Sequence, residues 1–147
     1  MTVGIVLQSP KTHDNVAAVL RLAICWGADL VAVVGARRWT ARHPLNTMRS
    51  EHSIPFLHFE DMRALAKSWS DHWTPIGVEI TPDAVDLRGF VHPRSALYMF
   101  GPEDGSLSPA PIRPRHVVKI PTSRCLNLAH AVGITLYDRS FKDGGAR

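Results

Sequence analysis

Cysteine is scarce in this sequence, and so is any pattern that would bind a metal. Cys25 and Cys125 are the only two cysteines and lie far apart, so neither a disulfide framework nor a zinc ribbon is indicated. The eight histidines contain no H-x-H or H-x-x-x-H pair, and we expect no metal site. This use of cysteine fits a reducing cytoplasm.

Long uninterrupted apolar runs are absent too. The start of the chain, Met1–Leu7, lacks the basic segment and long apolar stretch of a secretory signal. The most apolar window, Val16–Val34, is interrupted by Arg21 and Asp29, which argues against a membrane span. We therefore expect a cytoplasmic protein that does not cross a membrane.

Lysine is rare among the cations, because the chain has 4 Lys but 13 Arg. The 17 basic and 13 acidic side chains give a net charge of +4 and a pI near 9.5. This balance favours a polyanionic partner, and the planar guanidinium suits phosphate groups and stacked bases. With 147 residues, 45% of them hydrophobic, the chain fits one well-filled core, and we expect a single domain over residues 1–147.

Short runs rich in β-branched residues recur along the chain, and helix-like stretches separate several of them. This alternation is typical of an α/β fold, and we expect a mostly parallel six-stranded sheet flanked by helices. The expected strands are Val3–Leu7, Leu30–Val34, Ile54–Phe59, Ile76–Ile80, Ala96–Phe100 and Val117–Ile120.

Two expected helices carry unusually few charges. The first can be capped by Asp14 or Asn15 and ends before Gly27. Its other face surrounds the single charge of Arg21 with small apolar residues, and the last helix, expected over Leu126–Tyr137, has no charged side chain. The core-facing stripe of the first helix is Val16, Val19, Leu20, Ala23 and Ile24.

The uncharged faces of these two helices need apolar cover on two sides. A second copy of the chain would supply that cover, so we expect a homodimer that uses both helices. Packing of both helices within one monomer is the alternative. For Arg21, two interpretations stay open: a core charge paired with a carboxylate, or a functional charge directed into a cleft.

Two loops follow strands that we expect to be parallel. The glycine-containing acidic loop Gly101–Leu107 is either a ligand-binding loop at the carboxyl edge of the sheet or a plain surface turn. The second loop, Pro121–Cys125, leads directly into the uncharged last helix. The first backbone N–H groups of a helix can hold polar atoms of a ligand.

These segments form three ordered motifs that together resemble the SpoU branch of the SPOUT RNA methyltransferases. The closest match in size is the minimal tRNA wobble-ribose 2′-O-methyltransferase (TrmL-like) group. The motifs are Asn15 with Arg21 six residues later and Gly27 ending the helix, then Phe100-Gly101-Pro102-Glu103 with Gly105 and Leu107, then Ile120-Pro121 with Cys125-Leu126-Asn127.

The resemblance implies a C-terminal deep trefoil knot that binds S-adenosylmethionine, and it assigns roles to particular residues. Arg21 would act at the ribose 2′-hydroxyl during methyl transfer by stabilising developing negative charge. Asn15, Glu103 and Asn127 would hold Arg21 and the ribose through hydrogen bonds. The residues implied to bind the cofactor are Val78, Glu79, Gly101, Ile120, Cys125 and Leu126.

The implied substrate is RNA, with tRNA favoured and rRNA as the alternative. A loop that combines basic side chains with an aromatic ring is its expected contact surface, although the same pattern also suits a solvated loop with one packed tryptophan. The residues of this loop are Arg37, Arg38, Trp39 and Arg42.

Three departures from the family pattern bear on function. The glycine that the family carries after Asn15 is missing, Cys125 stands where serine is usual, and Asp104-Gly105-Ser106 replaces the Thr-Arg-Gly of the wobble group. The first of these departures makes a catalytically inactive cofactor-binding or RNA-binding module of the same fold an alternative. A base methyltransferase of the wider superfamily is another, although the presence of Arg21 argues against it.

Overall fold

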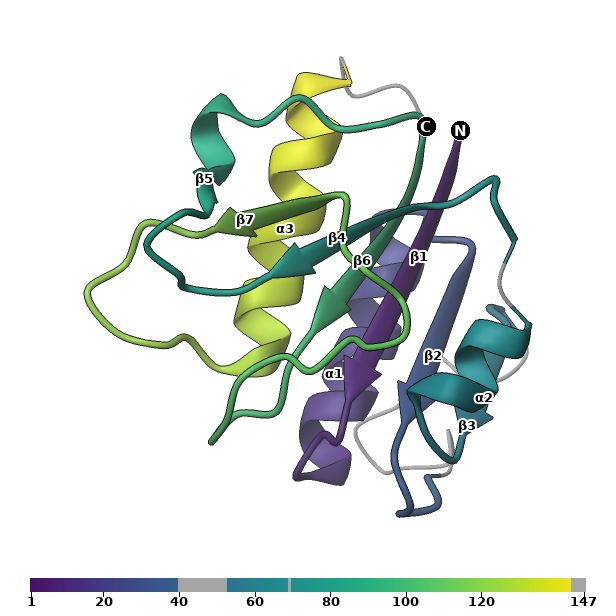
Figure 1. Ribbon diagram of the computed structural model, residues 1–147. Helices are drawn as coiled ribbons and strands as arrows, with labels where there is room; N and C mark the ends of the chain where they lie inside the picture. Colours follow the sequence, from purple (N-terminus) through teal and green to yellow (C-terminus); the bar gives the residue numbers. More distant parts are fainter. Residues whose placement is uncertain (40–52, 69, 144–147) are drawn as a thin grey trace.

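The computed structural model describes residues 1–39, 53–68 and 70–143 (Figure 1). In these residues seven strands form one sheet in the order β3-β2-β1-β6-β4-β7-β5, and all neighbouring strands run parallel. The strands are β1 Thr2–Gln8, β2 Leu30–Val34, β3 Phe56–Phe59, β4 Thr74–Val78, β5 Val85–Asp86, β6 Ser95–Phe100 and β7 His116–Lys119.

The expected parallel α/β sheet is confirmed, but the expected number of six strands is wrong. The additional strand is β5, which pairs with the outer edge of β7 through Val85 opposite Val118 and Asp86 opposite Lys119. Two residues are too few for a periodic apolar pattern to be visible in a sequence. The trefoil knot implied by the resemblance stays a prediction.

Helices cover both faces of the sheet, which explains why its strands read as nearly continuous apolar runs. Helices α1 (His13–Cys25) and α3 (Leu128–Lys142) pack side by side on one face, over the larger core cluster. Helix α2 (Met62–Lys67) and Leu107 and Ile112 from the loop after β6 pack against the other face. Among the described residues, no helix has the length and hydropathy needed to span a membrane.

The start of α1 differs from the expectation. Thr12, not Asp14 or Asn15, is the N-cap residue: its backbone is extended and its hydroxyl accepts a hydrogen bond from the N–H of Asn15 at 3.2 Å. The side chain of Asn15 is therefore not used for capping. At the other end, Gly27 has the positive φ of 66° that ends a helix readily.

Helix α3 begins two residues later than expected and extends to Lys142. It begins at Leu128 because the side-chain oxygen of Asn127 accepts a hydrogen bond from the N–H of Ala129 at 2.9 Å. The helix continues beyond Tyr137 through charged residues, and the chain segment after β5 supplies hydrogen-bond acceptors for two of them, Arg139 and Lys142.

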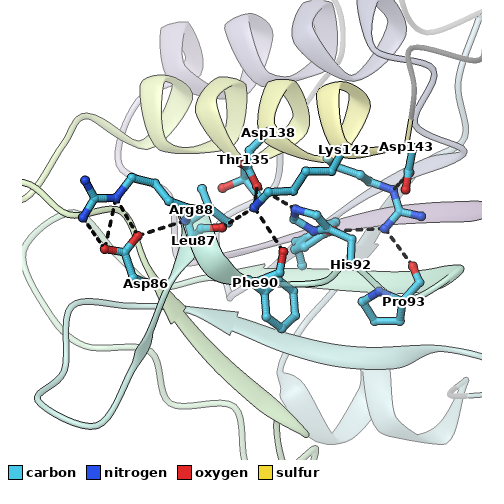
Figure 2. A network of polar contacts seen from close by, with 12 residues as sticks. Asp86, Leu87, Arg88, Phe90, His92, Pro93, Thr135, Asp138, Lys142 and Asp143 are labelled. Carbon is cyan, nitrogen blue, oxygen red and sulfur yellow. Dashed lines mark hydrogen bonds and ion pairs between the residues drawn. The ribbon is translucent and has the colours of Figure 1, made fainter.

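A polar network fastens the segment that follows β5 to this second half of α3 (Figure 2). Lys142 Nζ donates to the carbonyl oxygens of Leu87 at 2.5 Å and Phe90 at 3.1 Å. Arg139, which is 4% exposed, donates to the carbonyl oxygen of Pro93 at 2.8 Å. Leu87 belongs to a short 3-10 helix, η2 (Leu87–Gly89), so the network fixes this turn against α3.

Candidate cofactor pocket and its rim

Because the strands run parallel, the residues that follow β6, β4 and β7 meet at one edge of the sheet, where parallel α/β folds bind ligands. They line a pocket with about 620 Å³ of empty volume, part of which is open to solvent. All six residues implied to bind the cofactor line this pocket: Val78, Glu79, Gly101, Ile120, Cys125 and Leu126.

Gly101 is required where the loop after β6 folds back on itself. A Cβ atom at this position would lie 2.6 Å from the backbone nitrogen of Leu107 and 2.9 Å from its Cα atom. The backbone of Leu107 therefore packs directly on Gly101 in a way that a side chain would prevent. The N–H of Leu107 donates to Glu79 Oε2 at 2.7 Å, so Glu79 holds this loop as well as lining the pocket.

Three of the four side chains implied to be catalytic are joined by hydrogen bonds. Asn15 Nδ2 donates to Glu103 Oε1, and Asn127 Nδ2 donates to Asn15 Oδ1 at 3.0 Å. Glu103 lines the pocket, and its second carboxylate oxygen accepts the N–H of Lys11 at 3.3 Å. The starts of α1 and α3 and the loop after β6 are thereby connected at the pocket rim.

Arg21 is not part of this cluster. It lies on the exposed side of α1 and does not line the pocket of its own chain. At about 100° per helical residue, the six residues from Asn15 turn the Arg21 side chain roughly 120° away from the direction of Asn15. The structure thus brings together Asn15, Glu103 and Asn127 but leaves Arg21 on another side of the helix.

The basic loop after β2 is described only in part. Arg37 and Arg38 are exposed, Trp39 is half-buried, and Arg42 lies outside the described residues. The guanidinium carbon of Arg37 lies 4.6 Å from the centre of the Trp39 ring, and the His13 ring centre also lies 4.6 Å from it. Trp39 also packs against the larger core cluster, so it is a packed ring beside two exposed cations.

An exposed ion pair neutralises the acidic tip of the loop after β6. Lys11 Nζ lies 2.8 Å from Asp104 Oδ2, with both side chains at least half exposed. The hydrogen bond from Lys11 lowers the pKa of Asp104 below its ordinary value. This contact is one that the sequence analysis did not foresee, because nothing in the spacing of Lys11 and Asp104 indicates that the two loops meet.

The sequence analysis also missed Gln8. A polar residue that ends an otherwise apolar strand was the available signal. Its side chain exchanges two hydrogen bonds with the backbone of Ser108, in the loop that carries Gly101 and Glu103. The described residues hold no group of three or more His, Cys, Asp or Glu side chains that is placed to bind a metal ion.

A parallel α/β domain with a ligand pocket at the carboxyl ends of β6, β4 and β7 is the class that fold and site define. The model of the SpoU rRNA methylase family matches residues 2–137, and the chain belongs to this family. A search of curated protein sequences returned no match.

Solved structures share the fold at low sequence identity. The SpoU methyltransferase AviRb from Streptomyces viridochromogenes, in complex with AdoMet, has a TM-score of 0.81 and 21% identity, and the match covers 99% of this chain and 62% of that one. The A. aeolicus TrmH/SpoU tRNA modifying enzyme has a TM-score of 0.84 and 14% identity over 97% of this chain and 76% of its own.

A third structure, described as giving structural insights into the 2-OH methylation of C/U34 on tRNA, has a TM-score of 0.82 and 20% identity. Here the match covers 98% of this chain and 92% of that one. The chain is shorter than several of these relatives: it spans 61% of AviRb in a second structure of that enzyme and 56% of an rRNA methyltransferase from Sinorhizobium meliloti.

Proposed function

We propose that this chain is an S-adenosylmethionine-dependent RNA methyltransferase that acts on a ribose 2′-oxygen, with tRNA favoured over rRNA as its substrate. The observation that carries the proposal is the convergence of three separate stretches of sequence on one pocket, with Asn15, Glu103 and Asn127 hydrogen-bonded at its rim. Membership of the SpoU family and similarity to a structure described with tRNA 2-OH methylation support it.

The chemistry of the pocket lining suits S-adenosylmethionine. Val78, Ile120 and Leu128 give it apolar walls that suit the flat adenine ring. The same lining includes the polar side chain of Glu79 and the thiol of Cys125. When bound, S-adenosylmethionine supplies an activated methyl group.

The side chains at the rim supply orientation and charge. Methyl transfer to an oxygen is an in-line displacement, so the acceptor ribose must be held in one direction relative to the pocket. Asn15 and Asn127 offer amide groups and Glu103 a carboxylate for hydrogen bonds to ribose hydroxyls. Arg21 does not line the pocket of its own chain, and the role proposed for its guanidinium is to stabilise negative charge on the acceptor oxygen, with the proton passing to phosphate or water.

A transfer assay tests the proposal directly. The purified protein is incubated with methyl-labelled S-adenosylmethionine and either bulk tRNA or rRNA, and the methylated nucleoside is mapped by nuclease digestion and mass spectrometry. We expect label on a ribose of tRNA. Binding of the cofactor without transfer would identify an inactive module instead, and label on a base would identify a base methyltransferase.

We further propose that the enzyme acts in the cytoplasm as a homodimer. Support comes from large apolar side chains exposed on α3: Ile134 at 39%, Tyr137 at 56% and Phe141 at 72%. Their spacing of three and four residues places them on one side of the helix. The ring of Tyr137 also meets that of Trp26, just after α1, at 5.7 Å between centroids. A second copy of the chain would cover this apolar surface.

A further inference from the structure

The loop after β6 is held from both sides by the strands that flank β6 in the sheet. Strand β6 lies between β1 and β4, and a polar residue stands at the end of β1 and directly after β4. Gln8 ends β1 and bonds to Ser108, whereas Glu79, directly after β4, bonds to the N–H of Leu107 at 2.7 Å. Two consecutive residues of the returning loop are thus tied to opposite neighbours.

Both hydrogen bonds of the Gln8 side-chain amide go to the backbone of one residue, Ser108. Its Nε2 donates to the carbonyl oxygen of Ser108 at 2.7 Å, and its Oε1 accepts the N–H of Ser108 at 2.7 Å. A side-chain amide can donate and accept at the same time, as a backbone peptide does in a strand pair. The Gln8 side chain therefore acts as one further rung of pairing beyond the end of β1.

The position of Leu107 decides the shape of one pocket wall. Its backbone packs on Gly101 with no room for a Cβ atom between them, and Gly101 lines the pocket. The other ties to this loop, from Lys11 and Asn15, act on Asp104 and Glu103 near its start. Among the described residues, the side-chain hydrogen bonds to its return at Leu107 and Ser108 come from Gln8 and Glu79, and the Leu107 side chain also packs against the second core cluster.

We propose that Gln8 is a positioning residue for cofactor binding: by holding Ser108, it keeps Leu107 on Gly101 and so keeps the pocket wall in its binding shape. Gln8 does not itself line the pocket, so it acts through the loop. The identity of the cofactor rests on the proposed function, whereas the mechanical role of Gln8 rests on the contacts alone.

Two substitutions separate hydrogen bonding from packing. Gln8→Ala removes the side chain, and Gln8→Met keeps its length but neither donates nor accepts comparable hydrogen bonds. Both are expected to weaken S-adenosylmethionine binding about tenfold, because the loop occupies its binding-competent position for a smaller fraction of the time. At saturating cofactor the kcat should stay within about twofold, so that the change appears in KM for the cofactor.

His58→Ala is the matched control. The His58 ring bonds at 2.9 Å to the carbonyl oxygens of Gly35 and Arg37, so it fastens a different strand-end loop to a neighbouring strand. Its loss should leave the Kd for S-adenosylmethionine unchanged. Hydrogen exchange of the cofactor-free proteins provides a second readout: amide protection at Leu107 and Ser108 should fall in both Gln8 variants, while the global unfolding midpoint shifts little.

The outcomes are distinguishable. If the parent chain binds S-adenosylmethionine and the Gln8 variants bind it equally tightly, or if Gln8→Met restores the parent affinity, the positioning role is refuted and the proposed function stands. If the parent chain does not bind S-adenosylmethionine at all, the proposed function fails, and this inference fails with it. Selective loss of affinity together with selective loss of protection at Leu107 and Ser108 supports both.

Discussion

The side chains of Asn15 and Arg21 lie on the same helix but on different sides of it. Asn15 joins the pocket rim through Glu103 and Asn127, whereas Arg21 is exposed and outside the pocket lining. Under the charge-stabilising role proposed for Arg21, Arg21→Ala should nevertheless reduce methyl transfer by a factor on the order of 100 to 1,000, the loss typical of a charge-stabilising donor. The Kd for S-adenosylmethionine should stay within a few-fold, as measured by calorimetry.

Arg88→Ala is a suitable control for that variant. Arg88 is also an exposed arginine, but its guanidinium is paired with Asp86 at 2.6 Å, in the segment after β5. The substitution removes one positive charge without touching the pocket rim, so transfer should be unaffected. Full activity in Arg21→Ala would refute the catalytic assignment of Arg21, whatever the activity of Arg88→Ala.

The two cysteines offer a test of where the cofactor binds. Cys25 and Cys125 are both exposed, but only Cys125 lines the pocket. With S-adenosylmethionine at ten times its Kd, alkylation of Cys125 should slow about tenfold, because the free fraction falls by that amount. Cys25 should react at an unchanged rate. Peptide mass spectrometry over a time course measures both rates in one sample, and equal protection of the two thiols would contradict the assigned pocket.

At the scale of elements, the exposed apolar side of α3 leads to a prediction about assembly. Phe141→Glu places a charge where 72% of a phenylalanine side chain meets solvent, so the isolated subunit should fold normally. A dimer that buries this surface would be disrupted, because an unpaired charge is costly to bury. Light scattering at micromolar concentration should show a dimer for the parent chain and a monomer for the variant.

Leu57→Glu is the corresponding control. Leu57 is an apolar residue at 42% exposure on β3, the strand at the opposite edge of the sheet from β5. Because β3 is remote from the proposed interface in the sheet order, this variant should remain dimeric. A parent chain that scatters as a monomer would rule out the homodimer.

The network that joins the segment after η2 to α3 contains a buried histidine. His92 Nε2 donates to Asp138 at 2.8 Å, and the hydroxyl of Tyr98 donates to His92 Nδ1 at 2.5 Å. Burial raises the pKa of Tyr98 to about 12, so the hydroxyl keeps its proton. Burial also lowers the pKa of His92, although Asp138 opposes this effect and Arg139 and Lys142 reinforce it. The arrangement favours the neutral imidazole.

This lowered pKa has a defined consequence for stability. Between the ordinary histidine pKa of 6.5 and the lower value in the folded chain, the unfolded state binds more protons. The stabilisation is therefore present above pH 6.5 and is lost as the pH falls through that interval. Denaturant unfolding at pH 7.5 and pH 5 should show the loss in the parent chain.

In His92→Asn, the amide oxygen can still accept from Tyr98, but no group titrates. The variant should be about 1–3 kcal/mol less stable at pH 7.5, because the bond to Asp138 is lost, and its stability should depend less on pH between 7.5 and 5. The carboxyl groups with lowered pKa values, Asp86 at about 2 and Asp104, affect stability only at more acidic pH. Identical pH dependence in both proteins would contradict the assignment.

For the whole molecule, apolar patterning was sufficient to predict the class of fold but not every strand and helix end. The six runs rich in β-branched residues all form parallel strands, since strands buried on both faces leave a clear trace in a sequence. The pair Val85–Asp86 leaves none, because its strand identity comes only from pairing with β7. In the same way, the sequence could not distinguish the observed N-cap residue Thr12 from Asp14 and Asn15, because all three side chains can cap a helix.

The site was predictable only where motifs could be matched. Asn15, Glu103 and Asn127 are distant in sequence, and spacing alone does not indicate that they meet; the resemblance to the SpoU branch did. Side chains without a motif escaped notice. Gln8 acts through a contact that spans 100 residues, and such a contact exists only once the sheet order is known.

The net charge of the molecule leads to a final prediction about RNA. Arg37 and Arg38 are exposed beside the carboxyl end of β2, near the loop that bears Lys11, since Arg37 Nη1 donates to the Lys11 carbonyl oxygen at 2.7 Å. If three basic side chains contact phosphates of a single strand, raising the salt from about 50 to 200 mM should weaken RNA binding roughly 20-fold through counterion release.

Charge reversal at the exposed Arg38 should remove about one unit of charge neutralisation and flatten the dependence of log Kd on log salt by about 0.7. Reversal at Arg88, which is already paired with Asp86 in another part of the molecule, should leave the slope unchanged. Filter binding of tRNA across a salt series measures the slopes of all three proteins. A flat response in the parent chain would exclude phosphate contacts as the basis of RNA binding, whereas equal slopes in the parent and Arg38→Glu would place those contacts elsewhere on the surface.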